Sequence, residues 1–216
     1  MDAPNLAPNA ADKPSLPLID VPLIEATPEM LDGYGEIIHA QDARDIEIVR
    51  WPQPDWRPVD PGTGDEGGTT EGIFHFTWQG DVLRGKNEAV TDHYVLGWSC
   101  DPQTASEETE SVVRNKVLLW HCNYHPDGGQ LFFPLDPGPF VVPLALPGDD
   151  VKPEDFRAFW FDGSTGLYIH PSIWHEGVFP VNDKQRFFDK QGKVHARISV
   201  DFGAEFGCYL SVPLRK

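Results

Sequence analysis

Two stretches of the chain combine histidines with other polar side chains at spacings that suit proton transfer or metal binding. These are Asn123-Tyr-His125-Pro-Asp-Gly-Gly-Gln130 and Tyr168-Ile-His170-Pro-Ser-Ile-Trp174-His175-Glu176. Residues two apart on a β-strand face the same side, and a turn can return a later residue to that side. We therefore expect Asn123, His125 and Gln130 to face one cavity, with His175 supplied by a later strand.

Imidazole suits acid–base chemistry near neutral pH, because its ordinary pKa is about 6.5. We predict that His125 and His175 transfer protons and that Gln130 is the third catalytic residue. The same three residues would be the ligands of a metal, if one binds. Proton transfer alone requires no cofactor.

The spacing also resembles that of small β-barrel metalloenzymes of the cupin type, which carry His-x-His, a carboxylate a few residues later, and a further His. Here Asn123 replaces the first His and Gln130 replaces the acid. Neutral amides bind divalent metals more weakly than imidazole and carboxylate do. A weakly bound divalent metal therefore stays open as an alternative.

Several neighbours of these histidines are candidate substrate contacts. Trp174 offers a flat apolar wall beside His175, and His170 precedes the same turn. We predict that Trp174, His170 and Asn123 bind substrate. Glu176 is a base, an orienting partner of His175 or a solvent-facing residue, and the sequence does not choose among these.

Short strands separated by turns are expected to position these residues. The 21 prolines and 20 glycines are spread over the chain, which favours many short strands over a helical bundle. The pattern predicts an all-β fold, a cupin-type jelly-roll β-barrel, because this form leaves a pocket inside. Strands are expected from residue 73 onward and at 94–98, 117–122, 130–134, 140–146, 156–161, 166–170, 194–202 and 208–212.

The N-terminal part is expected to differ from the barrel. Residues 1–25 are Pro-rich and predict an extended arm that packs on the body or on a neighbouring subunit. Thr27-Pro28-Glu29 predicts the start of a short helix that ends near Gly33 or Gly35. Residues 26–216 are expected to form one domain, with 52–72 as a loop and a turn at 189–192.

Composition restricts the possible partners. The formal net charge is −17, with 17 Lys and Arg against 34 Asp and Glu, which disfavours nucleic acid and anionic membrane surfaces. The three cysteines lack metal-ligand spacing, and no apolar run is long enough to span a bilayer. We expect a cytoplasmic protein with a small-molecule substrate.

The chain resembles a known family, the ureidoglycolate lyases. The resemblance is carried by His125-Pro-Asp-Gly-Gly-Gln130-Leu-Phe-Phe-Pro134, Phe140-Val-Val-Pro-Leu-Ala145, Arg157-Ala-Phe and Tyr168-Ile-His170 through Trp174-His175. It implies a cupin-fold homodimer of purine and allantoin catabolism that splits ureidoglycolate into glyoxylate and urea. It also implies that Gln130 holds an amide or carbonyl of the substrate.

One departure concerns substrate binding. Members of the family usually carry an Arg-Tyr or Arg-His pair on an early strand, suited to gripping a carboxylate, and the matching pair here is His93-Tyr94. We predict that both residues bind substrate. Arg84 and Lys86 are either the replacement cations or loop surface.

The sequence leaves open where two arginines lie and leaves two alternative functions. Arg157 and Arg197 lie in strand-like runs, either on the solvent face or as a buried anion clamp. A metal-dependent cupin isomerase, hydrolase or dioxygenase is the first alternative function. A non-catalytic small-molecule-binding cupin is the second.

Overall fold

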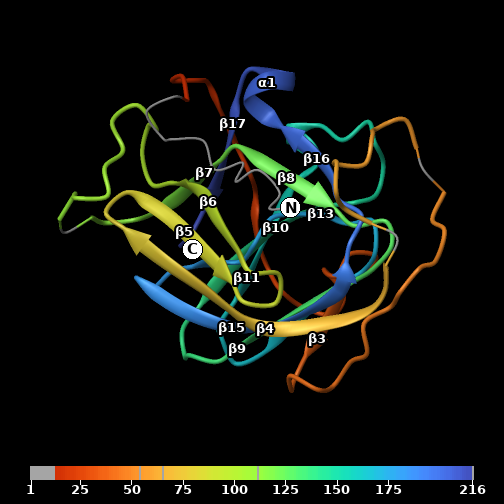
Figure 1. Cartoon of the computed structure of the whole chain (residues 1–216). Coiled ribbons are helices and arrows are strands. Elements are labelled where there is room, and N and C mark those ends of the chain that lie inside the picture. Colours follow the sequence, from red (N-terminus) through yellow and green to blue (C-terminus); the bar gives the residue numbers. More distant parts are fainter. Residues whose placement is uncertain (1–12, 54, 65, 111, 216) are drawn as a thin grey trace.

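The protein folds into two β-sheets packed face to face (Figure 1). The computed structural model describes residues 13–215 except 54, 65 and 111. The fold is all-β, of the jelly-roll type, as the turn-punctuated sequence predicts. Within the described residues the helical elements are a 3₁₀ turn, η2 (Pro153–Asp155), and one short helix, α1 (Phe202–Phe206). Neither approaches the length or apolar character that crossing a membrane would require.

The larger sheet has ten strands. Their order is β1 (Leu18–Asp20), β17 (Tyr209–Pro213), β7 (Lys116–Leu119), β6 (Asp92–Trp98), β5 (Val82–Asn87), β4 (Glu66–Gln79), β15 (Lys184–Val194), β9 (Gln130–Pro134), β12 (Gly166–Ile169) and β3 (Gly35–Ile38). The long strands β4 and β15 run side by side along one border of the molecule (Figure 1).

The smaller sheet has seven strands and supplies the opposite wall. Their order is β16 (Ile198–Asp201), β8 (His121–Tyr124), β13 (Trp174–His175), β10 (Phe140–Ala145), β11 (Arg157–Phe161) and β2 (Leu23–Glu25), and β14 (Phe179–Pro180) also pairs with β10. Phe140 of this sheet packs edge-on against Phe187 of the larger one, with ring centroids 4.9 Å apart. The two sheets therefore share one apolar core.

The N-terminal segment joins both sheets. Strand β1 pairs in parallel with β17, and β2 pairs in parallel with β11. Residues 13–25 thus pack on the body of the same chain. The first twelve residues of the predicted arm lie outside the described residues.

The predicted helix after Thr27 is wrong. Thr27 does act as an N-cap. Its hydroxyl accepts a hydrogen bond from the Met30 amide at 3.3 Å, and Leu31 N–H donates to Thr27 O at 3.0 Å. Residues 28–34 nevertheless form only consecutive turns. Gly33 has a φ of 82°, a left-handed conformation that ends helical hydrogen bonding after one turn.

Two predicted loops are strands. β4 begins at Glu66, inside the loop predicted for 52–72, and β15 runs unbroken through the turn predicted at 189–192. The two strands pair from Lys184↔Thr77 to Val194↔Glu66. Glycine and aspartate are turn formers locally, but pairing with a neighbour on each side holds β15 extended.

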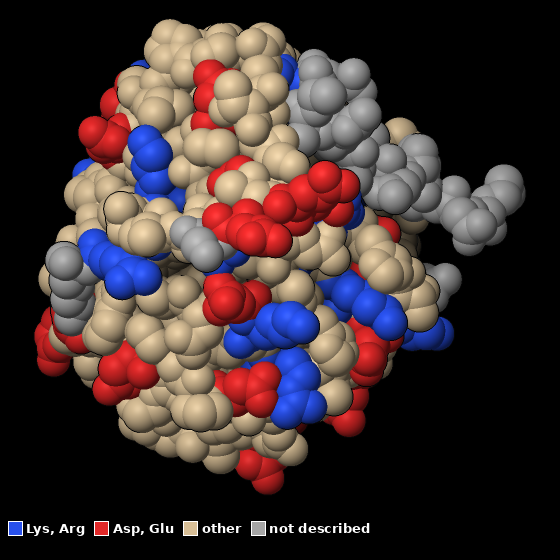
Figure 2. All heavy atoms as spheres, turned by 90° about the vertical axis from the view of Figure 1, so that its left-hand side faces the viewer, with Lys and Arg blue, Asp and Glu red and all other residues tan. Residues whose placement is uncertain are grey.

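The surface carries both signs of charge. Figure 2 shows Lys and Arg side chains interspersed with Asp and Glu on one face, rather than gathered in a basic patch. Such a mixed face offers no stripe that would follow a phosphate backbone.

Candidate active site

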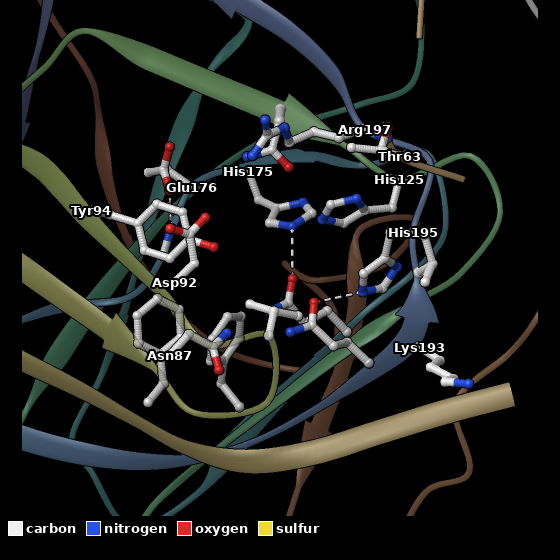
Figure 3. A pocket seen from close by; sticks show the side chains of 18 of the residues that line it. Thr63, Asn87, Asp92, Tyr94, His125, His175, Glu176, Lys193, His195 and Arg197 are labelled. Carbon is white, nitrogen blue, oxygen red and sulfur yellow. Dashed lines mark hydrogen bonds between the residues drawn. The ribbon is translucent and has the colours of Figure 1, made fainter. Parts of the chain in front are cut away.

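A cavity of about 300 Å³ lies between the two sheets. Strands β4, β5, β6, β9 and β15 of the larger sheet and β8 and β13 of the smaller sheet supply its walls, together with loop residues that include Gly62, Thr63, His195 and Arg197. Figure 3 shows the imidazoles of His125, His175 and His195 close together within it. This cavity is therefore the candidate active site.

His125 follows β8 and is 9% exposed. Its Nδ1 donates to the Ala196 carbonyl at 3.0 Å, so the neutral ring carries its lone pair on Nε2, on the side that faces His175 (Figure 3). Burial, with His195 and His175 adding to it, lowers the pKa of His125 well below its usual value. A neutral imidazole with a free lone pair is a proton acceptor.

His175, on β13, is the second member of the pair. Its ring centroid is 5.1 Å from that of His125. Nδ1 donates to the Ile173 carbonyl at 2.7 Å, and Nε2 lies 3.2 Å from Gln130 Oε1. Burial lowers its pKa, while Ile173 O and Glu176 oppose that shift. The structure thus brings His125, Gln130 and His175 together.

Gln130 has a different environment from the one predicted. Its Nε2 donates to Asp189 Oδ1 at 2.8 Å, while its Oε1 faces His175. Both ends of the carboxamide are therefore engaged by the protein, rather than offered to a substrate amide or carbonyl. Asp189 and Gln191, which continue this network, were missed because their segment was predicted as a turn.

His195 stacks on His125, with ring centroids 4.0 Å apart and planes inclined by 22°. Its Nε2 donates to Gln191 Oε1 at 2.6 Å, and its Nδ1 has no hydrogen-bond partner among the described residues. Burial and the neighbouring His175 lower the pKa of His195 to about 3. His195 is therefore neutral and supports the His125 ring.

Cationic and polar groups complete the wall. Arg197 lines the cavity and donates from Nε to Asp60 at 2.7 Å, and Lys193 also lies on the wall (Figure 3). Asn123 lines it too, and its Oδ1 is buried without a hydrogen-bond partner among the residues described. Tyr94 is a further wall residue, and burial raises its pKa far above the usual value.

A family model described as ureidoglycolate lyase matches residues 86–197, just over half of the 216-residue chain. The chain belongs to the ureidoglycolate lyase family. The matched stretch contains His125, Gln130, His175 and Asp189, and it ends at Arg197, so the cationic wall lies within it.

Individual ureidoglycolate lyases are similar to part of the chain. The Azotobacter vinelandii protein is 37% identical over 70 residues, which cover 32% of this chain and 42% of that relative. The Stutzerimonas stutzeri protein is 37% identical over 100 residues (42% and 59%), and the Pseudomonas syringae protein is 31% identical over 103 residues (43% and 61%). The alignments thus span less than two thirds of the length of these relatives.

Three of the predicted substrate-binding residues lie outside the cavity of this ureidoglycolate lyase family member. His93 is exposed on the outer face of β6. Trp174 is fully buried and donates from Nε1 to Gly148 O at 2.8 Å, because adjacent strand residues point to opposite faces and His175 takes the inner one. His170 packs its ring against Tyr168 instead, at 5.5 Å.

The structure also shows which of the candidate arginines reach the cavity. Arg157 donates to Glu154 O and Phe156 O and is not part of the cavity wall, whereas Arg197 is. Arg84 pairs with Glu107 at the exposed surface. Glu176 does line the cavity, and it accepts from His121 Nδ1 at 3.0 Å.

The residues present do not fit a metal centre. His175 directs one ring nitrogen at Ile173 O and the other at Gln130 Oε1, and the Gln130 amide is shared with Asp189. Across the described part of the chain, no three His, Cys, Asp or Glu side chains are grouped so that they could hold a metal ion. The donor set suits proton transfer better than coordination.

Proposed function

We propose that this protein is a carbon–nitrogen lyase that cleaves ureidoglycolate, or a close ureido acid, into glyoxylate and urea without a metal. One observation carries the proposal. In the stretch that the family model matches, two buried imidazoles face one cavity, one with a free lone pair and the other with its nitrogens against acceptor oxygens.

The environments of the two rings support His125 as the general base and His175 as the general acid. His125 Nε2 takes the proton of the carbinol hydroxyl, and the C–N bond breaks as the glyoxylate carbonyl forms. The electron pair stays on the urea nitrogen, which takes a proton from His175 Nε2. The 3.2 Å contact to Gln130 is longer than the other hydrogen bonds of these two rings, so a substrate nitrogen can share that proton. Proton return from His125 to His175 resets the site.

The substrate carboxylate needs a cation, and Arg197 supplies it in this proposal. Arg197 lines the cavity and keeps only its Nε on Asp60. A guanidinium can bind a carboxylate through two parallel hydrogen bonds. Arg197 would thus do, from the segment between β15 and β16, what the family's early-strand arginine does at the position held here by His93.

Family membership also supports two proposals about the whole protein: that it works as a homodimer and that it serves purine breakdown in the cytoplasm. Light scattering of the purified protein tests the first. A single-chain mass at micromolar concentration would contradict it.

The main experiment measures glyoxylate release from ureidoglycolate and related ureido acids. We expect His125→Ala and His175→Ala each to lower kcat by roughly 10²–10⁴-fold, the usual contribution of a positioned acid or base. His93→Ala is the matched control, because His93 is exposed on the outer face of β6 and should keep wild-type turnover. Unchanged turnover in both cavity variants would refute the proposal.

A further inference from the structure

A buried carboxylate lies behind the histidines without contributing to the cavity wall. Asp189 is fully buried on the inner face of β15. Three carboxamides donate to it: Gln130 Nε2 reaches Oδ1 at 2.8 Å, and Asn87 Nδ2 and Gln191 Nε2 reach Oδ2 at 2.9 and 2.8 Å. An ionised carboxylate can only accept, so three donors suit it.

The orientation of one carboxamide is fixed independently. Asn87 Oδ1 accepts from the Ala89 backbone N–H at 2.9 Å, so its Nδ2 must face Asp189. Gln191 is arranged consistently, because its Oε1 accepts from His195 while its Nε2 faces the same carboxylate oxygen. Oδ2 is thereby an acceptor of two hydrogen bonds, and Oδ1 is left for Gln130.

The orientation of Gln130 then determines which atoms of His175 carry protons. With its Nε2 on Asp189, Gln130 presents Oε1 to His175 Nε2. A lone pair at that nitrogen would face a lone pair on oxygen, so Nε2 must carry hydrogen. Nδ1 faces the Ile173 carbonyl and carries hydrogen as well. The ring that satisfies both contacts is the imidazolium.

We propose that Asp189 is a positioning residue that acts through Gln130, fixing the carboxamide so that His175 Nε2 is kept as the proton donor of the site. The catalytic part of this inference rests on the proposed lyase function. The protonation of His175 in the free protein does not.

The surroundings of His175 agree with one positive charge at this ring. The titratable and charged side chains that line the cavity with it are Asp92, Tyr94, His125, Glu176, Lys193, His195 and Arg197, and Asp189 lies behind Gln130. His125 and His195 each keep one ring nitrogen without a proton, so neither competes as a cation. Arg197 is engaged by Asp60, and Glu176 adds a favourable negative charge. Burial lowers the pKa of the ring, although Ile173 O and Glu176 oppose that shift. A neutral ring, however, would have to set a nitrogen lone pair against either Ile173 O or Gln130 Oε1, and this repulsion favours the charged ring.

Asp189→Asn gives a sharp expectation. The introduced asparagine keeps an oxygen for Asn87 and Gln191 and places an N–H₂ group where Oδ1 faced Gln130. Gln130 must then turn over, its Oε1 accepting from the introduced amide and its Nε2 donating to His175. His175 would lose the Nε2 proton and become neutral, with hydrogen on Nδ1 alone.

The double variant Asp189→Asn with Gln130→Glu tests the same logic in reverse. It moves the negative charge one residue closer to His175, and the introduced glutamate can accept both from the introduced asparagine and from His175 Nε2. His175 should regain its second proton. A purely structural role of Asp189 would give no such recovery, because the double variant is chemically further from the wild type.

The experiment is ¹⁵N NMR of the histidine rings in the substrate-free protein at about pH 7.5, above the Asp189 titration, with His175→Gln assigning the resonance. We expect two protonated ring nitrogens on His175 in the wild type, one in Asp189→Asn and two again in the double variant. Turnover should fall by about 10²-fold in kcat in the single variant, with KM within about threefold, and recover partly in the double variant.

The control is Asp136→Asn, the same chemical change on a carboxylate that pairs with Arg186 of β15 at the exposed end of the strand. It should leave the His175 resonances unchanged. A wild-type His175 with one ring proton, or an unaltered spectrum in Asp189→Asn, would overturn the inference, and the wild-type spectrum decides even if that variant does not fold. Expected spectra without ureidoglycolate turnover would instead count against the lyase function alone.

Discussion

The two ends of the space between the sheets share strand β15 but differ in the interactions that hold them together. At one end Phe140 stacks on Phe161 at 4.7 Å and meets Phe187 edge-on at 4.9 Å. At the other end three imidazoles and Asp189 are held by hydrogen bonds. The change occurs within two residues on β15, from Phe187 to Asp189.

The difference separates stability from orientation. The aromatic end stabilises the fold through buried apolar area, which is indifferent to small rotations of the rings. The polar end gains little net free energy from its hydrogen bonds, since each replaces one made with water, but it fixes the direction of every donor and acceptor. We therefore expect substitutions at the aromatic end to change mainly the free energy of unfolding, and substitutions at the polar end to change mainly activity and protonation.

The largest expected effect is on stability at the aromatic end. Phe187→Ala should lower the free energy of unfolding by about 3–5 kcal/mol, because it leaves a cavity between the sheets. Urea denaturation measures this, and the activity of the folded fraction should stay near wild type. Leu146→Ala, at a half-exposed position, is the control and should cost under about 1 kcal/mol. A loss in Phe187→Ala as small as the control's would remove the distinction between the ends.

A second prediction concerns the pH dependence that the polar end imposes. Burial raises the pKa of Asp189 from its usual 3.8 to about 6. Between these values the unfolded chain releases the proton while the folded protein keeps it, so unfolding becomes easier as pH rises. The contribution of Asp189 should fall by roughly 2–3 kcal/mol between about pH 4 and pH 6.

The comparison is made in a His175→Gln background, with and without Asp189→Asn, because asparagine does not titrate and the change in His175 protonation is then absent from both proteins. Unfolding free energies measured at several pH values should run together below about pH 4, separate between about pH 4 and pH 6 and stay apart above pH 6, with the asparagine variant relatively more stable. A difference that is constant across the range would contradict the prediction.

The smallest expected effect tests the position of the carboxylate-binding cation. Arg197→Gln should raise KM about 10–50-fold with little change in kcat, since one charge-assisted contact of the ground state is lost. Arg84→Gln is the control, because Arg84 pairs with Glu107 at the exposed surface. An equal rise of KM in both variants would place substrate recognition outside the cavity.

Much of the β-fold could be predicted from local pattern. The strand at 130–134 has the predicted bounds, and most others begin and end within two residues of expectation. β15 could not be predicted in the same way, because its Asp189-Lys-Gln-Gly run is turn-like and is held extended only by its two neighbours. A search for alternation would have helped, since Gln185, Phe187, Asp189 and Gln191 all face inward.

The site could be predicted only in part, because local spacing can be read from the sequence whereas contacts made in the folded chain cannot. Spacing placed His125, Gln130 and His175 on one side of their strands. It could not tell that His175 rather than Trp174 takes the inner face, or that His93 lies outside while Tyr94 lies inside. The ring tautomers depend on partners such as Ala196 O and Ile173 O, which come from the folded chain and leave no sequence signal.

The pairing of β15 with β9 sets Gln191 opposite Gln130 and Asp189 opposite Phe132. Because side chains alternate along a strand, a slip of one residue would turn Phe188 and Lys190 inward and put a lysine where the carboxylate belongs. A register shift of one residue in β15 would therefore disrupt the whole catalytic arrangement, because it would bury the Lys190 ammonium group beside the imidazoles. Proteins that share this network should accordingly tolerate length changes in the loops at either end of the strand, but not within it.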